Sequence, residues 1–325
     1  MSDYALYGWR VRSDVALEPV AEARYTSEPD LVVSAATVCD VPSTQPEGTV
    51  LAQFPREGGG TKTYWLVGRE EGLLLRMPGL VEYHISRDVR HVAWVRSPGT
   101  QLEYAREVFR GHVMALLLGL AGYAVFHSSA VVLPEAHAPG AGRAVAILGG
   151  TASGKSTLAG LMVAAGAKFL TDDLLCVDAA GDDIVVRGGC AELRLRPKAT
   201  GLSRLFAGAP TRRTLDERLA VTLGRGSLAT HPLGLLVFPE ISDGAERTTV
   251  SNLTPQEAAI KLAGSPRMSG WLYRGVLEQQ FNCLTTLADQ VPAVCVEVPA
   301  TDELGPELAG SLMQEVGRAL ESSSS

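Results

Sequence analysis

The sequence predicts an α/β protein in two parts, a smaller β-rich domain over residues 1–98 and a larger α/β domain over residues 99–325. Short segments of strand character, separated by turn residues, dominate the first hundred positions. Beyond them, apolar strand-like segments alternate with segments of helical period, which is the pattern of a layered α/β fold. The length also favours about two domains, at roughly 150 residues for each.

The N-terminal part is predicted to be β-rich because six segments combine aromatic and β-branched residues between turn residues. They are YGWRVRS, VLAQF, TYWLVGR, GLLLRM, LVEYHIS and HVAWV. Another short strand is expected at 31–34, and a glycine-rich turn at 56–62.

The boundary between the two parts is placed at 97–100, where the sequence SPGT ends the strand pattern. From Leu102 to Leu117 apolar residues recur at a period of 3.6, which predicts a helix that ends near Gly122. The apolar run at 113–126, about 14 residues long, is shorter than the ~20 residues that cross a bilayer. It is therefore interpreted as a buried helix, and no membrane partner is expected.

The larger part alternates predicted strands with predicted helices. Strands are expected at AVFHSSAVVL, AVAILG, KFLTDD, LLCVD, DIVVRG, AELRLR, LGLLVFP and AVCVEVP. Helices are expected at 156–165, 255–263, 271–289 and 307–321, and a loop at 134–143.

Composition excludes several classes of protein. The 29 Lys and Arg against 36 Asp and Glu leave a net charge of −7, so no basic field is available to bind nucleic acid. The five cysteines are scattered and form no C-x-x-C pair, which argues against a zinc site and a disulfide framework. Because the N-terminus lacks the apolar core of a secretory signal, a cytoplasmic location is expected.

The motif G-x-x-x-x-G-K-[ST], called the P-loop below, follows the predicted strand AVAIL and directly precedes a predicted helix. It is formed by Gly149, Gly150, Thr151, Ala152, Ser153, Gly154, Lys155, Ser156 and Thr157. A glycine-rich turn before a helix lets backbone N–H groups surround the phosphates of a nucleotide. Lys155 is expected to reach the β and γ phosphates, and the Ser156 hydroxyl to bind Mg²⁺.

Two adjacent acids, Asp172 and Asp173, end the strand KFLTDD sixteen residues after Ser156. Phosphoryl transfer to a hydroxyl needs an acid that holds the metal and a carboxylate that takes the proton. The strand is expected to neighbour the P-loop strand, so the two acids could divide these tasks. The alternative is a polar turn that only ends the strand.

His127 begins the sequence HSSAV, at the end of the strand that precedes the P-loop strand. This position directs it toward the strand ends where ligands bind in open α/β sheets. The alternative is a half-buried histidine with a structural role.

Four segments in this order resemble the catalytic domain of HPr kinase/phosphorylase and its shorter bacterial relatives. They are HSSAV, GGTASGKST, LTDDLLCVD, and the Glu192-Leu193-Arg194 of CAELRLRP. The resemblance covers about residues 105 to 300 and implies a P-loop kinase core related to phosphoenolpyruvate carboxykinase. The opening YALYGWRVRSDVALEP resembles stand-alone HPr-kinase-like proteins, some of which are encoded with lasso peptides and phosphorylate them on serine.

The resemblance implies a role for each matching residue. Asp172 would be the base that deprotonates the acceptor hydroxyl, and Asp173 and Glu192 would be carboxylates on the magnesium side. His127 would belong to the catalytic residues. The sequence departs from the family where H-S-S replaces H-G-S, and where Leu195-Arg196-Pro197 replaces a glycine-rich continuation.

A late arginine is the remaining catalytic candidate. The family has an arginine-containing loop near its C-terminal helices, and GSPRMSGW places Arg267 in roughly that position. There it would stabilise the charge of the transferring phosphoryl group. The alternative is a solvated arginine on a surface loop.

The sequence therefore predicts an ATP- and magnesium-dependent kinase that phosphorylates a serine hydroxyl of a peptide or protein. Two alternatives remain open: a small-molecule kinase of the same fold, acting on an amino acid or sugar-like alcohol, and a nucleotide-responsive binding module. The expected partners are the nucleotide and a peptide or protein substrate, and a homo-oligomer is possible.

Overall fold

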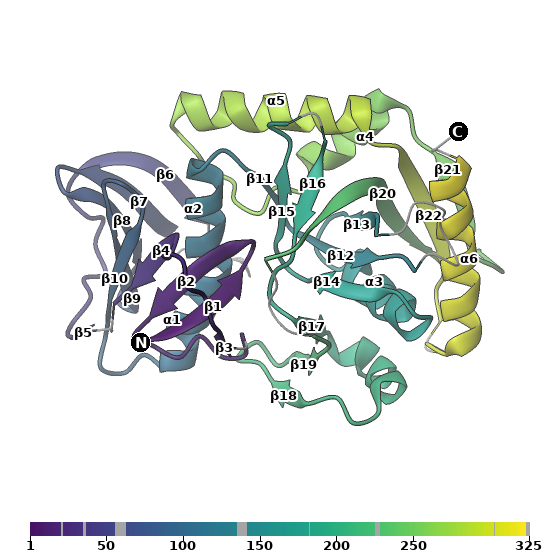
Figure 1. Cartoon of the computed structure of the whole chain (residues 1–325), viewed down its shortest axis with the longest axis horizontal. Coiled ribbons are helices and arrows are strands. Elements are labelled where there is room, and N and C mark those ends of the chain that lie inside the picture. The colour runs from purple at the N-terminus through teal and green to yellow at the C-terminus, as the bar shows by residue number, and fades with distance from the viewer. Residues whose placement is uncertain are drawn as a thin grey trace.

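The computed structural model describes residues 1–20, 22–34, 37–55, 63–134, 142–181, 183–224, 228–301 and 303–322. These residues form a mixed α/β structure with a ten-stranded N-terminal sheet, a nine-stranded core sheet and a small three-stranded sheet. The N-terminal and core sheets lie side by side, with helices between and around them (Figure 1). The α/β class predicted from the sequence is confirmed at this level. The turn predicted at 56–62 and most of the loop predicted at 134–143 lie outside the described residues.

The N-terminal sheet has the strand order β3-β1-β2-β4-β10-β9-β8-β7-β6, and β5 pairs with β10. Its strands are β1 (Ser2–Leu6), β2 (Trp9–Ser13), β3 (Glu22–Ala23), β4 (Leu31–Val33), β5 (Thr37–Val38), β6 (Thr49–Pro55), β7 (Thr63–Arg69), β8 (Gly72–Met77), β9 (Val81–Ser86) and β10 (His91–Arg96). The strands β6 to β10 form an antiparallel meander, whereas β4 runs parallel to both of its neighbours.

The strand predicted at YGWRVRS is confirmed over β2 but begins two residues late, because the first two residues of the segment form the turn between β1 and β2. Tyr7 and Gly8 have φ angles of 52° and 77°, and they reverse the chain between Leu6 and Trp9, which pair across the turn. Two consecutive left-handed residues make the two-residue turn whose twist suits an antiparallel hairpin. Tyr7 therefore lies in the turn itself, and Trp9 begins the second arm of the hairpin.

One long helix lies against the N-terminal sheet. It consists of α1 (Leu102–Val108), a π-helical turn η1 (Phe109–Val113) and α2 (Met114–Leu120). Phe109 packs on Trp94 and Tyr83, with ring centroids 6.1 and 6.5 Å apart. The helix thus belongs to the same buried cluster as the N-terminal sheet, although it follows the sequence boundary at residue 98. The division into domains 1–98 and 99–325 stays a prediction.

The core sheet has the order β11-β15-β16-β20-β13-β12-β14, and β22 and β21 continue it beside β20. Its strands are β11 (Ala124–Phe126), β12 (Ser128–Val132), β13 (Ala144–Leu148), β14 (Lys168–Thr171), β15 (Leu175–Asp178), β16 (Val185–Arg187), β20 (Thr230–Ser242), β21 (Thr249–Asn252) and β22 (Ala293–Pro299). Alternate residues of β13 enter two different apolar clusters, one on each face of the sheet.

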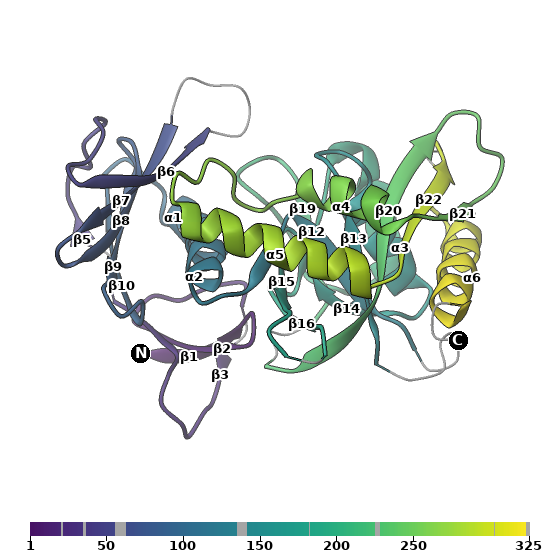
Figure 2. The same cartoon turned by 90° about the horizontal axis from the view of Figure 1, so that it is seen from above.

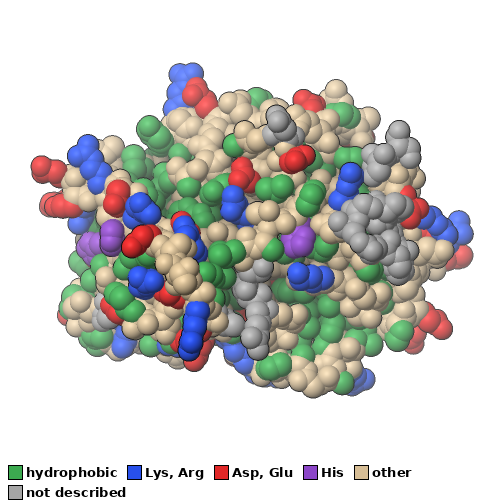
Figure 3. All heavy atoms as spheres, viewed as in Figure 1, with side chains coloured by type: hydrophobic (Ala, Val, Ile, Leu, Met, Phe, Trp, Pro, Cys, Tyr) green, Lys and Arg blue, Asp and Glu red, His purple; other side chains and the backbone are tan. Residues whose placement is uncertain are grey.

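Helices cover both faces of the core sheet. The helices α3 (Lys155–Ala164) and α6 (Pro306–Ser322) pack on one face, and α4 (Pro255–Ala263) and α5 (Arg274–Gln290) on the other. Figures 1 and 2 show α5 running along the core toward the N-terminal sheet, with α6 at the far end. On the face drawn in Figure 3, basic and acidic side chains are interspersed. None of the helices in the described ranges is long and apolar enough to span a membrane.

Two strand predictions near the P-loop need correction. The segment AVFHSSAVVL is two strands, β11 and β12, interrupted at His127. The strand before Asp172, β14, pairs with β12 and is not a direct neighbour of the P-loop strand β13. Because β12 is antiparallel to both, β14 and β13 nevertheless run in the same direction and end at the same edge of the sheet. The acids therefore still lie at the P-loop edge.

The segment AELRLR forms β17 (Glu192–Leu195) in the three-stranded sheet and does not join the core sheet. Its partners there are β19 (Leu219–Thr222) and then β18 (Thr211–Arg213). A 3₁₀ helix, η3 (Pro197–Phe206), follows β17 and packs on α3. This sheet lies at the bottom of Figure 1, below α3.

The segment 264–273 between α4 and α5, called the strap below, ties the core to the N-terminal sheet. At one end it pairs with β11, where Arg267 N donates to Val125 O at 3.2 Å. At the other end it pairs with β6, where Gln53 N donates to Gly270 O at 3.0 Å. Trp271 is buried there with its ring edge on Phe54, at a centroid distance of 5.9 Å.

The close approach of the strap to β6 predicts that substitution of Gly270 strongly lowers the free energy of unfolding. Gly270 has a φ of +87°, and a Cβ built on it would lie 1.9 Å from Gln53 O. We expect Gly270→Ala to lower the free energy of unfolding by about 4 kcal/mol, because backbone strain and a backbone clash act together. Gly166→Ala is the matched control, since Gly166 has a φ of +107° with open space around it. Left-handed strain alone should cost about 1–2 kcal/mol there. Urea unfolding of both variants measures the difference, and equal losses would contradict a close approach of the strap to β6.

Candidate active site

The P-loop has the curled backbone that a phosphate-binding turn requires. It connects β13 to α3, and Gly149, Ala152 and Gly154 have positive φ angles of 144°, 68° and 93°. A Cβ on Gly149 would lie 2.7 Å from Ser153 Oγ, so the turn closes on itself there. The Ser153 hydroxyl is buried without a hydrogen-bond partner among the described residues. The N-terminus of the ten-residue helix α3 therefore opens onto a loop with an unused donor, which suits a polyphosphate.

Lys155 is folded onto the P-loop. Its Nζ donates to Gly149 O and Gly150 O, each at 2.8 Å, and its side chain is largely buried. Burial lowers the pKa of Lys155, while the charges of Asp172 and Asp173 oppose that shift. The ammonium group is thus held at the loop, within reach of a bound phosphate.

A cleft of about 640 Å³ opens beside the P-loop. Five cationic side chains and only two carboxylates line it, so it carries excess positive charge. The cations are Lys155, Arg194, Arg196, Lys198 and Arg218, and the carboxylates are Asp172 and Asp173. The volume lies in the range of small-molecule sites, and the charge favours a polyanionic ligand.

Asp172 is buried and accepts three hydrogen bonds. Its Oδ1 accepts from Ser156 Oγ at 2.9 Å and from Ser129 Oγ at 2.6 Å. Its Oδ2 accepts from the backbone N–H of Arg194 at 2.9 Å. The structure therefore places Asp172, rather than Asp173, directly against the P-loop serine.

Asp173 makes a different set of contacts. Its φ is +73°, and its carboxylate lies 3.1 Å from His127 Nδ1 and 3.2 Å from Arg267 Nη2. Burial alone would raise the pKa of Asp173, but the charge of Arg267 and the hydrogen bond from His127 hold it well below its usual range. Asp173 is thus an ionised carboxylate with a histidine on one oxygen and an arginine on the other.

His127 lies in the interruption between β11 and β12 and lines the cleft. Its Nδ1 is 3.0 Å from the backbone oxygen of Asp173 and 3.1 Å from the Asp173 carboxylate. Both neighbours are acceptors, so the geometry favours the tautomer with the proton on Nδ1 and the lone pair on Nε2. The site thus contains an Asp–His pair with a basic nitrogen.

Arg267 reaches Asp173 from the strap, but it does not line the cleft. Its side chain is only 6% exposed, and the backbone of η1 approaches it so closely that a Cβ on Gly111 would lie 2.9 Å from its Nη2. The structure therefore brings Arg267 to the site as a partner of Asp173, behind the cleft.

Glu192 is also close to the two acids, but an arginine occupies its carboxylate. Glu192 Oε1 and Oε2 accept from Arg212 Nε and Nη2 at 2.7 and 2.8 Å. Glu192 lines a small cavity of about 20 Å³ together with Asp172, Asp173 and Tyr7. Its predicted role on the magnesium side stays a prediction.

Several neighbours of the acids were not predicted. Ser129 and Arg194 lie inside the quoted segments HSSAV and CAELRLRP, but no role was predicted for either. Tyr7 comes from the N-terminal sheet, and its hydroxyl lies 3.4 Å from Arg110 O, behind the site. Only the three-dimensional structure brings Tyr7 to the acids, because about 165 residues separate them in the sequence.

The residues fit a nucleotide with magnesium. The unpartnered Ser153 hydroxyl and the cationic cleft suit phosphates, and the Ser156 hydroxyl with Asp172 Oδ1 offers two hard oxygen donors 2.9 Å apart. Within the described ranges, no three His, Cys, Asp or Glu side chains form a metal cage. A magnesium ion bound with phosphates needs only one or two carboxylates from the protein. The Asp172 carboxylate and the Ser156 hydroxyl therefore suit such an ion.

Comparison with known proteins gives only remote similarity to solved structures. No protein-family model and no curated protein matches the chain. Among solved structures, it is similar to the HPr(Ser) kinase/phosphatase from Coxiella burnetii, with 11% sequence identity. The alignment covers 60% of this chain and 88% of that chain, with a TM-score of 0.31. A similarity this remote carries no argument about the function of the chain.

A half-buried histidine behind the site predicts a pH dependence. Burial lowers the pKa of His112 in η1 to about 3; the charge of Arg267 lowers it too, and that of Asp173 opposes the shift. The ring also packs edge-on against Tyr64. Because the unfolded chain binds this proton near pH 6.5, stability should fall as pH drops from 6.5 toward 3.

We expect His112→Gln to reduce the slope of unfolding free energy against pH between 6.5 and 4.5 by about 1 kcal/mol per pH unit. His91→Gln is the control, because the His91 side chain is 62% exposed. Unfolding in urea across this pH range measures the slope. An unchanged slope in His112→Gln would show that His112 is not a buried neutral imidazole.

Proposed function

We propose that the protein is a magnesium- and ATP-dependent kinase that transfers a phosphoryl group to a serine hydroxyl of a peptide or protein. One observation carries the proposal: the P-loop Lys155 and Ser156 share a cationic cleft with Asp172, Asp173 and His127. A binding module would need the phosphate loop, but not an Asp–His pair beside it. The N-terminal sheet next to the site adds a surface that a small alcohol substrate would not require.

The P-loop side of the cleft would hold the nucleotide. The α3 N-terminus and Lys155 bind the phosphates, and Ser156 and Asp172 hold the magnesium ion on its protein side. The bound nucleotide and metal supply the phosphoryl group and neutralise its charge during transfer. Arg194 and Arg218 add positive charge along the cleft.

The Asp–His pair would take the proton of the acceptor. His127 Nε2 accepts the hydroxyl proton as the serine oxygen attacks, and Asp173 holds Nδ1–H and stabilises the imidazolium. Arg267 keeps Asp173 ionised and in place. This exchanges the two roles expected from the sequence, because the contact between Ser156 and Asp172 favours Asp172 for the metal.

The first test concerns the P-loop lysine. We expect Lys155→Ala to abolish phosphoryl transfer while the fold remains, because Lys155 contributes charge to the phosphates. Lys168→Ala, an exposed lysine on β14, should keep normal turnover. Transfer is measured with labelled ATP, magnesium and serine peptides encoded beside the gene, followed by mass spectrometry. Unchanged turnover in Lys155→Ala would refute the kinase proposal.

The second test separates the two acids. Asp172→Asn should weaken magnesium-dependent nucleotide binding as well as turnover, because a neutral amide is a poorer ligand for a hard cation. Asp173→Asn should bind nucleotide normally and lose about 10²–10⁴-fold in turnover, because His127 loses its carboxylate. Calorimetry and single-turnover rates measure both. The reverse pattern would restore the roles expected from the sequence, and equal losses would refute both assignments.

A further inference from the structure

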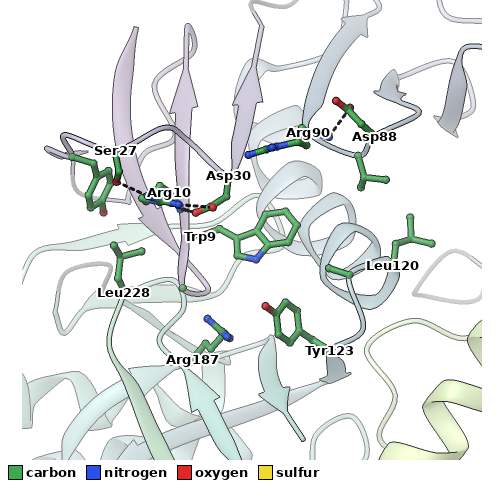
Figure 4. Close-up of a pocket in the computed structure, with 14 residues that line it drawn as sticks. Trp9, Arg10, Ser27, Asp30, Asp88, Arg90, Leu120, Tyr123, Arg187 and Leu228 are labelled. Atoms are coloured by element: carbon green, nitrogen blue, oxygen red, sulfur yellow. Dashed lines mark hydrogen bonds and ion pairs between the residues drawn. The ribbon is translucent and has the colours of Figure 1, made fainter. Parts of the chain in front are cut away.

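A second cavity, of about 760 Å³, lies between the β1–β2 hairpin and the core sheet (Figure 4). It is separate from the P-loop cleft, and no residue lines both. Five segments form its walls: the hairpin, the chain before β4, the turn between β9 and β10, the end of α2, and β16. Trp9, Arg10, Arg90, Leu120, Tyr123 and Arg187 are among the residues that line the cavity.

Arg187 on β16 gives this cavity an anion-binding floor. Its guanidinium lies over the Tyr123 ring, 4.7 Å from the centroid, and its Nη2 donates to Asp178 Oδ2 at 2.8 Å. Its Nε is buried without a hydrogen-bond partner among the described residues. Figure 4 shows the guanidinium directed into the cavity, toward Trp9. A carboxylate could use the remaining donors of this oriented guanidinium.

The other arginines differ in how far their donors are already used. Arg10 is engaged by both oxygens of Asp30 and by Ser27, so it braces the wall. Arg90 is exposed, and among the described residues its side chain makes one long contact, 3.4 Å to Pro29 O. The unused donors of the cavity thus belong to Arg187 and Arg90, which favours an acidic ligand.

Apolar surface lies beside these donors. Trp9, Leu120 and Tyr123 are half-buried, and Figure 4 shows the indole of Trp9 reaching between the hairpin and α2. Ala121 and Asp88 are exposed at the rim, so the cavity stays open on one side. An open cavity with an aromatic platform and an arginine that keeps unused donors suits a side chain of a longer peptide, whose backbone continues outside.

The hairpin that forms this cavity also reaches the candidate active site. Gly8 and Trp9 line the cavity, whereas Tyr7 lines the small space beside Asp172 and Asp173. In addition, Tyr123 precedes His127 by four residues, about 13 Å along an extended strand. A peptide held in the cavity is therefore within a few residues of the proposed transfer site.

We propose that this cavity is a docking site for the peptide substrate, and that it takes an acidic segment with an aromatic or aliphatic side chain. The apolar side chain packs on Trp9 and Tyr123, and the carboxylate binds Arg187. The assignment of the peptide as substrate rests on the proposed function, whereas binding to the cavity does not.

Binding is tested first, without nucleotide, by calorimetry with a blocked peptide of core Glu-Phe-Glu and a matched peptide of core Lys-Phe-Lys. We expect the acidic peptide to bind at least about tenfold more tightly, and Arg187→Gln to remove this preference. Arg318→Gln on the distant helix α6 is the control, with its side chain 58% exposed. The proposal would be overturned if the two peptides bound equally tightly. It would also be overturned if free phenylacetate bound as tightly as the acidic peptide.

Two variants of opposite charge at the exposed rim test the proposal independently, in case the Arg187 variant does not fold. Ala121→Glu should weaken the acidic peptide and Ala121→Lys should strengthen it, since the substitutions differ only in charge. Lys155→Ala should leave this binding intact, so failure of the kinase proposal and failure of the docking proposal give different results. Identical affinities in the two Ala121 variants would contradict the docking site.

The substrate role is then tested with a serine peptide that carries the acidic segment. We expect Arg187→Gln to raise its KM about tenfold and leave kcat unchanged, because docking is lost but the transfer site is intact. A serine peptide without the segment should be turned over equally by both proteins. A fall in kcat for that shorter peptide would show that Arg187 acts only on the structure.

Discussion

The half-buried carboxylate of Asp173 joins parts of the chain that are far apart in sequence. His127 reaches it from the β11–β12 junction, and Arg267 reaches it from the strap. Without both partners, burial would drive this carboxylate toward its neutral form, and the Asp–His pair would lose its negative member. The proposed acid–base chemistry therefore depends on the strap, although Arg267 itself does not line the cleft.

This dependence explains why the N-terminal sheet belongs to the site. The strap is held at one end by β11 and at the other by β6, with Trp271 buried in the N-terminal core. The same sheet contributes Tyr7, and its packed helix contributes the close backbone of Gly111. The N-terminal sheet thus supports the site from behind and, through Trp9, also forms the second cavity.

Charge distinguishes the two cavities. The P-loop cleft has excess cations, which suits a polyphosphate, whereas most cationic groups of the second cavity already have acidic partners. Its remaining donors are few and lie beside aromatic rings, so it favours a single carboxylate with an apolar neighbour. A strongly charged nucleotide and a mildly acidic peptide would therefore bind at different places.

The sequence by itself determined the features that depend on residues adjacent in the chain. The P-loop could be recognised because its glycines, Lys155 and Ser156 are contiguous and their geometry is local. Helix α4 was predicted with its observed bounds, 255–263, because Thr254 caps it and Gly264 follows it. The turn at Tyr7 and Gly8 was missed, because the aromatic and β-branched residues of YGWRVRS suggest one continuous strand and hide a tight turn at its start.

Tertiary structure decided which residues meet. In the core sheet, β12 lies between β13 and β14. The hydrophobic periodicity of the sequence does not predict this order, because the packing of the whole sheet determines which strands are neighbours. The tertiary structure set Asp172 against Ser156 and Asp173 against His127, although the two acids are adjacent in sequence and point to different partners. It also placed Arg267 behind the cleft and Tyr7 near the acids. Burial and the path of the strap, rather than the local sequence, determine the positions of these two side chains.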